Sequence, residues 1–306
     1  MTPGGIVDAH LHLWDLASFR YPWLADADSA PLRHDYLVED WRRDADGVPV
    51  AATVHVQAEL DHSVDPARET AWLADLAAAN GTGGAAVPTV CVGYADLRAP
   101  DLDDVLDRHQ RYPLFRGIRQ QAWYDPESVR ADVPRDNLLD DERWVAGLDR
   151  LAARGLTFDL QVWPRQLARA ADVFACRPDL TVVVEHTGLP GDTDDRAGWR
   201  AGLAEFARRV PRSVLKISGL RFVSPGWDVH AMAPVVHEAI DVFGPDRCMF
   251  GSNFPVDRLS TGYRALWQTY EAMVGGYSAP ERAQLLRETA ARVYRTGGTE
   301  ARGRGR

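Results

Sequence analysis

Eight short apolar segments alternate with longer helix-like stretches along this chain of 306 residues. The strand-like segments span residues 6–12, 51–57, 85–92, 115–120, 157–162, 181–185, 214–218 and 248–251. Helix-like stretches between them include residues 66–79, 141–154, 164–175, 199–209 and 229–243. Such alternation is typical of parallel strands joined by crossover helices. Because eight units close into a barrel of about 250 residues plus insertions, the pattern predicts one α/β domain, a (β/α)8 barrel.

Two connections and the C-terminal region add detail to this prediction. One connection runs from about residue 13 to 50 and is rich in aromatics, and the other runs from residue 121 to about 140. Long loops in a compact domain are usually lids or binding loops, and both follow strands 1 and 4 on the face where barrel active sites lie. Beyond strand 8, a helix over residues 261–274 and a capping box from Ser278 to Glu281 predict extra C-terminal helices. We therefore expect the barrel to occupy residues 1–298, followed by a disordered tail over residues 299–306.

Composition excludes several classes of function. The net charge is −9, and the arginines at residues 302–306 form a short tail rather than a basic face, which argues against nucleic-acid binding. No apolar run approaches membrane-spanning length and no leader-like segment precedes the first strand, so we expect a cytoplasmic protein. The partner that we expect is a small-molecule substrate and not a membrane. Cys91, Cys176 and Cys248 are widely separated, which favours buried thiols over disulfides or a cysteine metal site. The sequence leaves the oligomeric state open, a homo-oligomer included.

The first strand ends in a His-x-His pattern, His10 and His12. Residues two apart on a strand share a face, so both imidazoles should point the same way. Imidazole is a common zinc ligand and a general acid or base near neutral pH. The pattern therefore predicts a metal or catalytic site at the end of the first strand.

Polar residues also recur on one face of several other strands or directly after them. They are Thr53, His55 and Gln57; Arg119 and Gln121; Asp159, Gln161 and Trp163; His186; Lys216 and Ser218; and Asn253. The apolar faces fit burial against helices, so the polar faces should converge on the barrel axis. Burying polar groups is unfavourable unless they pair or bind something. Together they predict a ligand site at the strand C-terminal ends.

Five motifs, in order along the chain, carry a family resemblance. They are Asp8-Ala9-His10-Leu11-His12, Gly117-Ile118-Arg119, Glu185-His186-Thr187-Gly188-Leu189-Pro190, Lys216-Ile217-Ser218-Gly219-Leu220 and Gly251-Ser252-Asn253-Phe254-Pro255. With them the chain resembles the lactonase branch of the metal-dependent amidohydrolase superfamily, which includes fuconolactonase, rhamnonolactonase, sulfomuconolactone hydrolase and pyrone-dicarboxylate lactonase. The resemblance implies a barrel that opens lactone rings with water. It also implies that His10, His12 and His186 are active-site histidines and candidate metal ligands, and that Arg119 holds substrate.

The chain departs from the family pattern at Asn253. The family usually has an aspartate there, which takes a proton from the attacking water, and an amide cannot serve as a base. The missing carboxylate also removes an anionic ligand, so we expect zinc or manganese binding to be weak or absent. The remaining candidate bases are His186, Asp257 and Glu185, although strand alternation is expected to turn Glu185 away from the axis. His55, His62 and Glu59, at or beyond the second strand, are further candidates for the barrel mouth.

The leading functional hypothesis is hydrolysis of a small oxygen-rich or carboxylated lactone by water attack on the ring carbonyl. In it, His10, His12, His186 and Asn253 form the catalytic group. Arg119 binds substrate together with Gln57, Gln161, Trp163, Lys216 and Trp14. Two alternatives remain: a barrel that binds a small acid or sugar without turnover, and a metal-dependent non-oxidative decarboxylase, against which Asn253 counts.

Overall fold

The computed structural model describes residues 4–81, 85–128, 133–191 and 195–297, so the predicted tail lies outside the described residues. Eight strands form one sheet in the order β1 to β8. They are β1 (Ile6–Leu11), β2 (Val50–Val56), β3 (Val90–Gly93), β4 (Phe115–Arg119), β5 (Thr157–Leu160), β6 (Thr181–Val184), β7 (Ser213–Ile217) and β8 (Cys248–Phe250). Each neighbouring pair is parallel. The two edges of the sheet meet where the His12 amide donates to the Phe254 carbonyl at 2.7 Å and the Asn253 amide to the His10 carbonyl at 2.7 Å. The predicted (β/α)8 barrel is confirmed.

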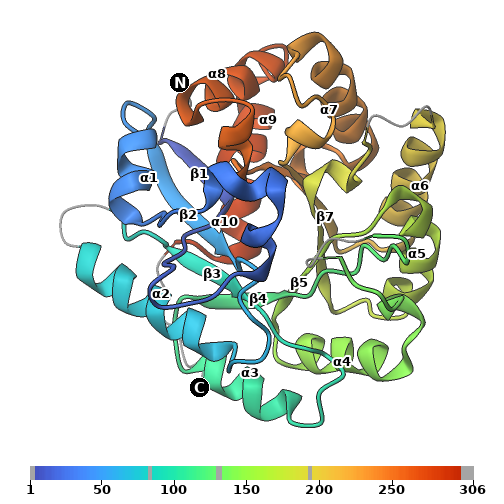
Figure 1. The fold of residues 1–306 in the computed structure, drawn as a ribbon. Helices are drawn as coiled ribbons and strands as arrows, with labels where there is room; N and C mark the ends of the chain where they lie inside the picture. The colour runs from blue at the N-terminus through green and yellow to red at the C-terminus, as the bar shows by residue number, and fades with distance from the viewer. Residues whose placement is uncertain (1–3, 82–84, 129–132, 192–194, 298–306) are drawn as a thin grey trace, which may run out of the picture.

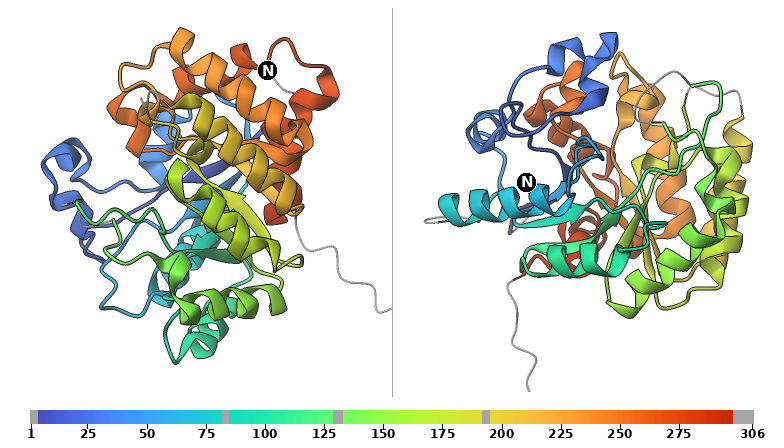
Figure 2. Two further views of the ribbon diagram at one scale, coloured as in Figure 1. Left: turned by 90° about the vertical axis from the view of Figure 1, so that its right-hand side faces the viewer. Right: turned by 60° about the horizontal axis from the view of Figure 1, so that its bottom comes forward.

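Helices surround this barrel, as Figures 1 and 2 show. Those after β2 to β8 are α2 (Ala67–Asn80), α3 (Leu102–Gln110), α4 (Glu142–Ala153), α5 (Leu167–Ala175), α6 (Arg196–Arg209), α7 (Val229–Phe243) and α8 (Tyr263–Met273). Local sequence explains their starts: the Asp141 side chain, for example, accepts from the Arg143 and Trp144 amides and caps α4. No helix in the described part of the chain is long and apolar enough to cross a membrane.

The C-terminal region is one continuous helical run over residues 279–294, as the capping box predicts, and it contains a π-helical turn. Its parts are α9 (Ala279–Ala283), the π-helical turn (Gln284–Glu288) and α10 (Thr289–Tyr294). The predicted capping box holds, with the Glu281 amide donating to the Ser278 hydroxyl. The π-helical turn contacts β1 and β8, and α10 also contacts both strands. This region therefore packs on the barrel where its first and last strands meet.

The apolar core of the barrel has two parts, one outside the strands and one inside them. The larger cluster lies between strands and helices, and a smaller one fills the barrel interior with Val54, Val56, Val92, Val183 and Met249. Ala290, Val293 and Tyr294 of α10 belong to the same inner cluster, so this helix closes one end of the barrel. The polar residues of the site occupy the other end, at the strand C-termini.

The predicted polar face of β2 is wrong. Val54 and Val56 point into the barrel, and His55 instead lies 3.5 Å from Glu69 on α2, on the outer side. The ladder between β1 and β2 shifts register between Asp8 and Leu11. This irregularity leaves one extra residue in β1, which lets Ala9 and His10 both face inward.

Both long loops are present and structured in part. The first contains two 3-10 helices, Pro22–Ala25 and Ala27–Leu32, and then α1 (Val38–Asp44). It folds back on itself through an antiparallel bridge between Trp14 and Tyr36. The loop after β4 ends in a 3-10 helix, Leu138–Asp140. A separate prediction fails: Cys91 and Cys248 are buried, but Cys176 is exposed.

Candidate functional site

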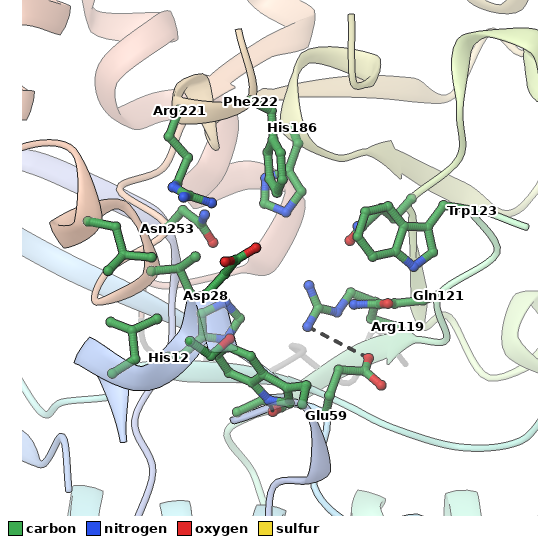
Figure 3. A pocket seen from close by; sticks show the side chains of 17 residues that line it. His12, Asp28, Glu59, Arg119, Gln121, Trp123, His186, Arg221, Phe222 and Asn253 are labelled. Carbon is green, nitrogen blue, oxygen red and sulfur yellow. Dashed lines mark hydrogen bonds and ion pairs between the residues drawn. The ribbon is translucent and has the colours of Figure 1, made fainter. Parts of the chain in front are cut away.

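A pocket opens at the strand C-terminal ends (Figure 3). Its wall is built by strand ends, by the loops that follow them and by the first long loop. The lining includes His12, Trp23, Asp28, Glu59, Arg119, Gln121, Trp123, Gln161, His186, Arg221, Phe222 and Asn253. A single pocket thus gathers residues from nearly the whole length of the chain, as the sequence analysis expects for a barrel.

His10 and His12 lie side by side and present nitrogen lone pairs to each other. The Nδ1 of His12 is 2.7 Å from the Val56 carbonyl oxygen, which can only accept, so this nitrogen carries the proton. The Nδ1 of His10 is 3.1 Å from a Glu185 carboxylate oxygen, which favours a proton there as well. In the neutral rings both Nε2 atoms are then acceptors, yet they are only 3.2 Å apart. A cation between them, either a proton or a metal ion, removes this repulsion.

His186 and Glu185 complete the cluster. The His186 ring centre is 4.8 Å from that of His10, and its Nδ1 is 3.0 Å from the Ser218 hydroxyl. His10, Glu185 and His186 have ligand atoms within 4.8 Å of one another, a spacing that suits one metal ion. Three imidazoles and a carboxylate are donors that zinc commonly accepts. His10, His186 and Glu185 therefore fit a divalent metal, and His12 adjoins this group with its Nε2 3.2 Å from that of His10.

The orientation predicted for Glu185 is wrong. Val183 points into the barrel interior, so Glu185, two residues later, points inward too. His186 follows it into the site because the backbone turns after the strand, with a φ of 51° at His186. The expected alternation assumed that the strand continues through residue 186, whereas β6 ends at Val184.

Glu185 belongs to a buried network of charges. One of its oxygens is 3.3 Å from Lys216 Nζ, and the other is 3.2 Å from Arg119 Nη1. Lys216 is also 2.7 Å from Asp159, which accepts a hydrogen bond from the Tyr294 hydroxyl of α10 at 2.6 Å. The network thus runs from the helix that closes the barrel up to the histidines.

This environment sets the protonation states of the site. Burial by itself would raise the pKa of Glu185, but His10, Arg119 and Lys216 hold it well below its usual range. Burial lowers the pKa of His10 well below its usual value and lowers the pKa of His186 to about 4. At neutral pH the site therefore contains a charged carboxylate beside neutral imidazoles.

Arg119 lines the pocket, and two hydrogen bonds to groups outside the pocket lining fix its guanidinium. Besides Glu185, it donates from Nη2 to the Gln57 carbonyl oxygen at 2.5 Å. Its Nε is buried with no hydrogen-bond partner among the described residues. An arginine fixed in this way can offer a donor to an oxygen of a ligand at little entropic cost.

A second acidic group lies at the pocket edge. Glu59 has a φ of 55°, an uncommon backbone conformation for a residue other than glycine. His62 lies 3.2 Å from its carboxylate and stacks on Tyr94 at 3.8 Å between ring centres. Burial would raise the pKa of Glu59, but His62 and Arg119 lower it. Glu59 is thus an ionised carboxylate within the pocket.

Several pocket residues were not predicted from the sequence, namely Asp28, Trp123, Arg221 and Phe222, and Arg221 is the charged one among them that lies next to the histidines. It belongs to a 3-10 helix, Leu220–Phe222, directly after β7, and its Nε is buried without a hydrogen-bond partner among the described residues. Gly219 precedes it with a φ of 62°, and a Cβ there would lie 2.7 Å from His186 Nδ1. The place of Arg221 directly after the motif Lys216–Leu220 is the only signal for it in the sequence, because it lies outside any strand or helix periodicity.

The structure separates the predicted substrate-binding residues into two groups. Arg119 and Gln161 line the pocket, and Trp163 lies next to it, stacked on Trp123 at 5.3 Å between ring centres. Gln57, Lys216 and Trp14 do not line it.

Each residue of the second group has its partners elsewhere. The Gln57 side chain bonds Glu59, and Lys216 is held by Asp159 and Glu185. Trp14 is fully buried and donates to the His34 carbonyl oxygen at 2.6 Å. Trp23 is the aromatic residue of the first loop that lines the pocket in its place.

Of the predicted catalytic residues, His12, His186 and Asn253 line the pocket, and His10 lies fully buried against both other histidines. The Asn253 Nδ2 donates to Asp257 Oδ1 at 2.9 Å. Asp257 itself is fully buried and does not line the pocket. Among the candidate bases, His186 is thus the one that both lines the pocket and belongs to the histidine cluster.

Fold, motifs and site define a barrel hydrolase of one family. The chain belongs to the amidohydrolase family, whose model matches residues 7–296. It is 34% identical over 303 residues to an L-fucono-1,5-lactonase from Burkholderia multivorans, covering 94% of this chain and 95% of that protein. An L-fucono-1,5-lactonase from Burkholderia ambifaria is 30% identical over 296 residues, covering 94% of this chain and 95% of its own length. A crystal structure of an amidohydrolase from Burkholderia multivorans with bound zinc superimposes with a TM-score of 0.79 at 30% identity, covering 95% of this chain and 99% of that chain.

Proposed function

We propose that this protein is a hydrolase that opens the ring of a small hydroxyl-rich lactone. The observation that carries the proposal is the cluster of three imidazoles and Glu185 at the base of a pocket that also contains Arg119. Relatives named L-fucono-1,5-lactonase, similar over nearly the whole chain, support the same chemistry.

His10, His12 and His186, with Glu185, are the residues that would hold a divalent metal. When bound, such an ion polarises a carbonyl group and makes a coordinated water more acidic. Because Lys216 and Arg119 already neutralise much of the negative charge on Glu185, and Asn253 brings none, we propose that metal binding is weak.

Proton transfer is assigned to His186. Its pKa near 4 keeps the ring neutral at pH 7, and the nearby Glu185 carboxylate stabilises the imidazolium that forms when it accepts a proton from water. The same proton is then available to the ring oxygen when the carbon–oxygen bond of the lactone breaks. Arg119 donates to an oxygen of the substrate and fixes its orientation.

The charges of the pocket favour hydroxyl groups over additional carboxylates on the substrate. Arg119 and Arg221 bring two positive charges to the pocket, and Glu59 and Asp28 bring two carboxylates to it (Figure 3). A dicarboxylate would meet repulsion from Glu59, whereas vicinal hydroxyl groups can donate to it. Trp23, Trp123 and Phe222 supply flat apolar surfaces against which a sugar ring can pack.

The test is a panel of lactones with the purified protein. It should contain L-fucono-1,5-lactone, L-rhamnono-γ-lactone and, as a carboxylated comparator, 2-pyrone-4,6-dicarboxylate. Acid release is followed with and without a chelator, and the metal content of the protein is measured before the assay. His186→Asn is the inactive control.

We expect turnover of a sugar lactone, none of the dicarboxylate, and little bound metal. Saturable binding of lactones without turnover would instead favour the binding barrel, for which the absence of a carboxylate at residue 253 is the supporting observation. Turnover of an aromatic carboxylic acid with release of carbon dioxide, abolished by chelator, would favour the decarboxylase.

A further inference from the structure

The side chain of Asn253 faces the pocket from a tightly fixed backbone. It follows β8 with a φ of 54°, and its side chain is nearly fully buried. Its amide donates to the His10 carbonyl at 2.7 Å, and its carbonyl accepts from the Asp257 amide at 3.1 Å. Because its backbone N–H and C=O groups are both hydrogen-bonded, the main motion that remains for this residue is rotation of its side-chain amide.

Asp257 is a buried carboxylate directly behind this amide. It belongs to the 3-10 helix Val256–Leu259 and is fully buried. Its Oδ1 accepts the hydrogen bond from Asn253 Nδ2 at 2.9 Å, and its Oδ2 has no hydrogen-bond partner among the described residues. Burying a carboxyl group with only one hydrogen bond costs folding free energy, so a functional role for Asp257 would explain its presence.

The charge of Asp257 decides which end of the amide meets the pocket. An ionised carboxylate can only accept hydrogen bonds, whereas an amide has one donor end and one acceptor end. The carboxylate therefore holds Nδ2 and leaves Oδ1 free, and Figure 3 shows the Asn253 oxygen turned toward the interior of the pocket.

We propose that Asp257 is a positioning residue that fixes Asn253 with its Oδ1 toward the pocket, where this oxygen accepts a hydrogen bond from the attacking water. The inference rests on the proposed function. The water oxygen forms the new bond to the ring carbonyl carbon, one proton passes to the neutral His186 ring, and the bond from that carbon to the ring oxygen breaks. The ring oxygen then takes the proton from His186 and leaves as a hydroxyl group. Asn253 orients the water and does not take its proton.

This arrangement depends on pH. Burial raises the pKa of Asp257 to about 7, with the Asn253 hydrogen bond and then Arg221 acting in the opposite direction. Arg221, after β7, and Tyr270, on α8, are the other titratable side chains in its electrostatic environment. Below pH 7 the protonated Asp257 carboxyl can donate a hydrogen bond to Asn253 Oδ1. The side-chain amide can then rotate so that its NH2 group faces the pocket, and this group cannot accept a hydrogen bond from water. Turnover should therefore fall as the pH drops through about 7.

The amide can be observed directly by NMR because the chain contains only three asparagines, Asn80, Asn137 and Asn253. In protein labelled with 15N-asparagine, the side-chain pair of Asn253 is the one lost in Asn253→Asp. We expect this pair to shift with pH around a midpoint near 7, and the titration to disappear in Asp257→Asn. Asn80 donates its side-chain amide to two backbone carbonyls and serves as an internal reference that should not move.

Kinetics of the same proteins on L-fucono-1,5-lactone test the role in turnover. Asp257→Asn should lower kcat at pH 8 by about tenfold or more with little change in KM, and should lose the fall in rate near pH 7. The matched control is Asp44→Asn, because Asp44 anchors Arg258 in the same 3-10 helix without touching Asn253. It should keep both the rate and the pH profile.

The two measurements separate failure of this inference from failure of the proposed function. The Asn253 amide signal could shift with pH only when Asp257 is present, in a protein that opens no lactone. That result would support the positioning of Asn253 by Asp257 and would reject the proposed lactonase function. An amide signal that ignores pH and the Asp257→Asn substitution would overturn the positioning role. An active Asp257→Asn enzyme with the parental rate and pH profile would overturn it as well.

Discussion

Replacing Lys216 with methionine should destabilise the fold while leaving substrate binding unchanged. Lys216 is fully buried and bridges Asp159 at 2.7 Å and Glu185 at 3.3 Å. Methionine has a similar shape without the charge, so the substitution removes the cation and little volume. Glu185 keeps Arg119 as a partner at 3.2 Å, whereas Asp159 keeps only neutral partners.

Removing one partner of a buried ion pair costs about 3–5 kcal/mol, because the remaining charge stays buried. At about 2 °C per kcal/mol for a protein of this size, Tm should fall by roughly 6–10 °C. Burial already raises the pKa of Asp159, and loss of Lys216 raises it further. The folded state then holds a proton that the unfolded state releases, so the variant should lose more stability at pH 8 than at pH 5.5.

The assay is thermal and urea unfolding of parent and variant at both pH values, combined with KM for the lactone. The double variant Lys216→Met/Asp159→Asn is the control, and it should recover a large part of the lost stability because no unpaired charge remains at residue 159. A stable Lys216→Met protein whose KM rises more than tenfold would refute the reasoning and return Lys216 to the substrate site.

Three other substitutions test the pocket. Arg119→Ala should raise KM by roughly 10- to 150-fold, since a charge-assisted hydrogen bond contributes about 1.5–3 kcal/mol, and an unchanged KM would remove Arg119 from the site. Asn253→Asp should bind zinc or manganese more tightly than the parent in titration calorimetry, because it adds a carboxylate near the three imidazoles; stoichiometric zinc that resists chelator in the parent would contradict this. His186→Asn should abolish turnover but not lactone binding. Because the pKa of His186 is about 4, the Asp257→Asn enzyme should keep a constant rate down to about pH 5, and a loss of activity near pH 6.5 would show that another group is the base.

The alternation of strands and helices was sufficient to predict the barrel, and strand alternation correctly placed Arg119, Asp159 and Lys216 inside it. The same rule failed for β2, because His55 has a buried partner, Glu69, on the helix side of the sheet. Periodicity cannot show which side of a strand will supply such a partner.

The rest of the site lies where the backbone leaves regular structure. Glu59, His186 and Asn253 all have positive φ angles, and Arg221 follows Gly219, which has one as well. At such positions side-chain direction follows from local turns and not from a period of two. The family resemblance identified the histidines, but the partners of each charge became visible only in three dimensions.

Closure of the barrel by α10 has a consequence for synthesis of the chain. The Tyr294 hydroxyl donates to Asp159, so the last described helix supplies a partner to charges contributed by β5, β6 and β7. While a ribosome is still making residues 289–294, those carboxylates and Lys216 have no apolar cover on that side. The interior of the barrel can therefore exclude water only after residues 289–294 have been added, which makes packing of α10 a late step in the folding of this topology.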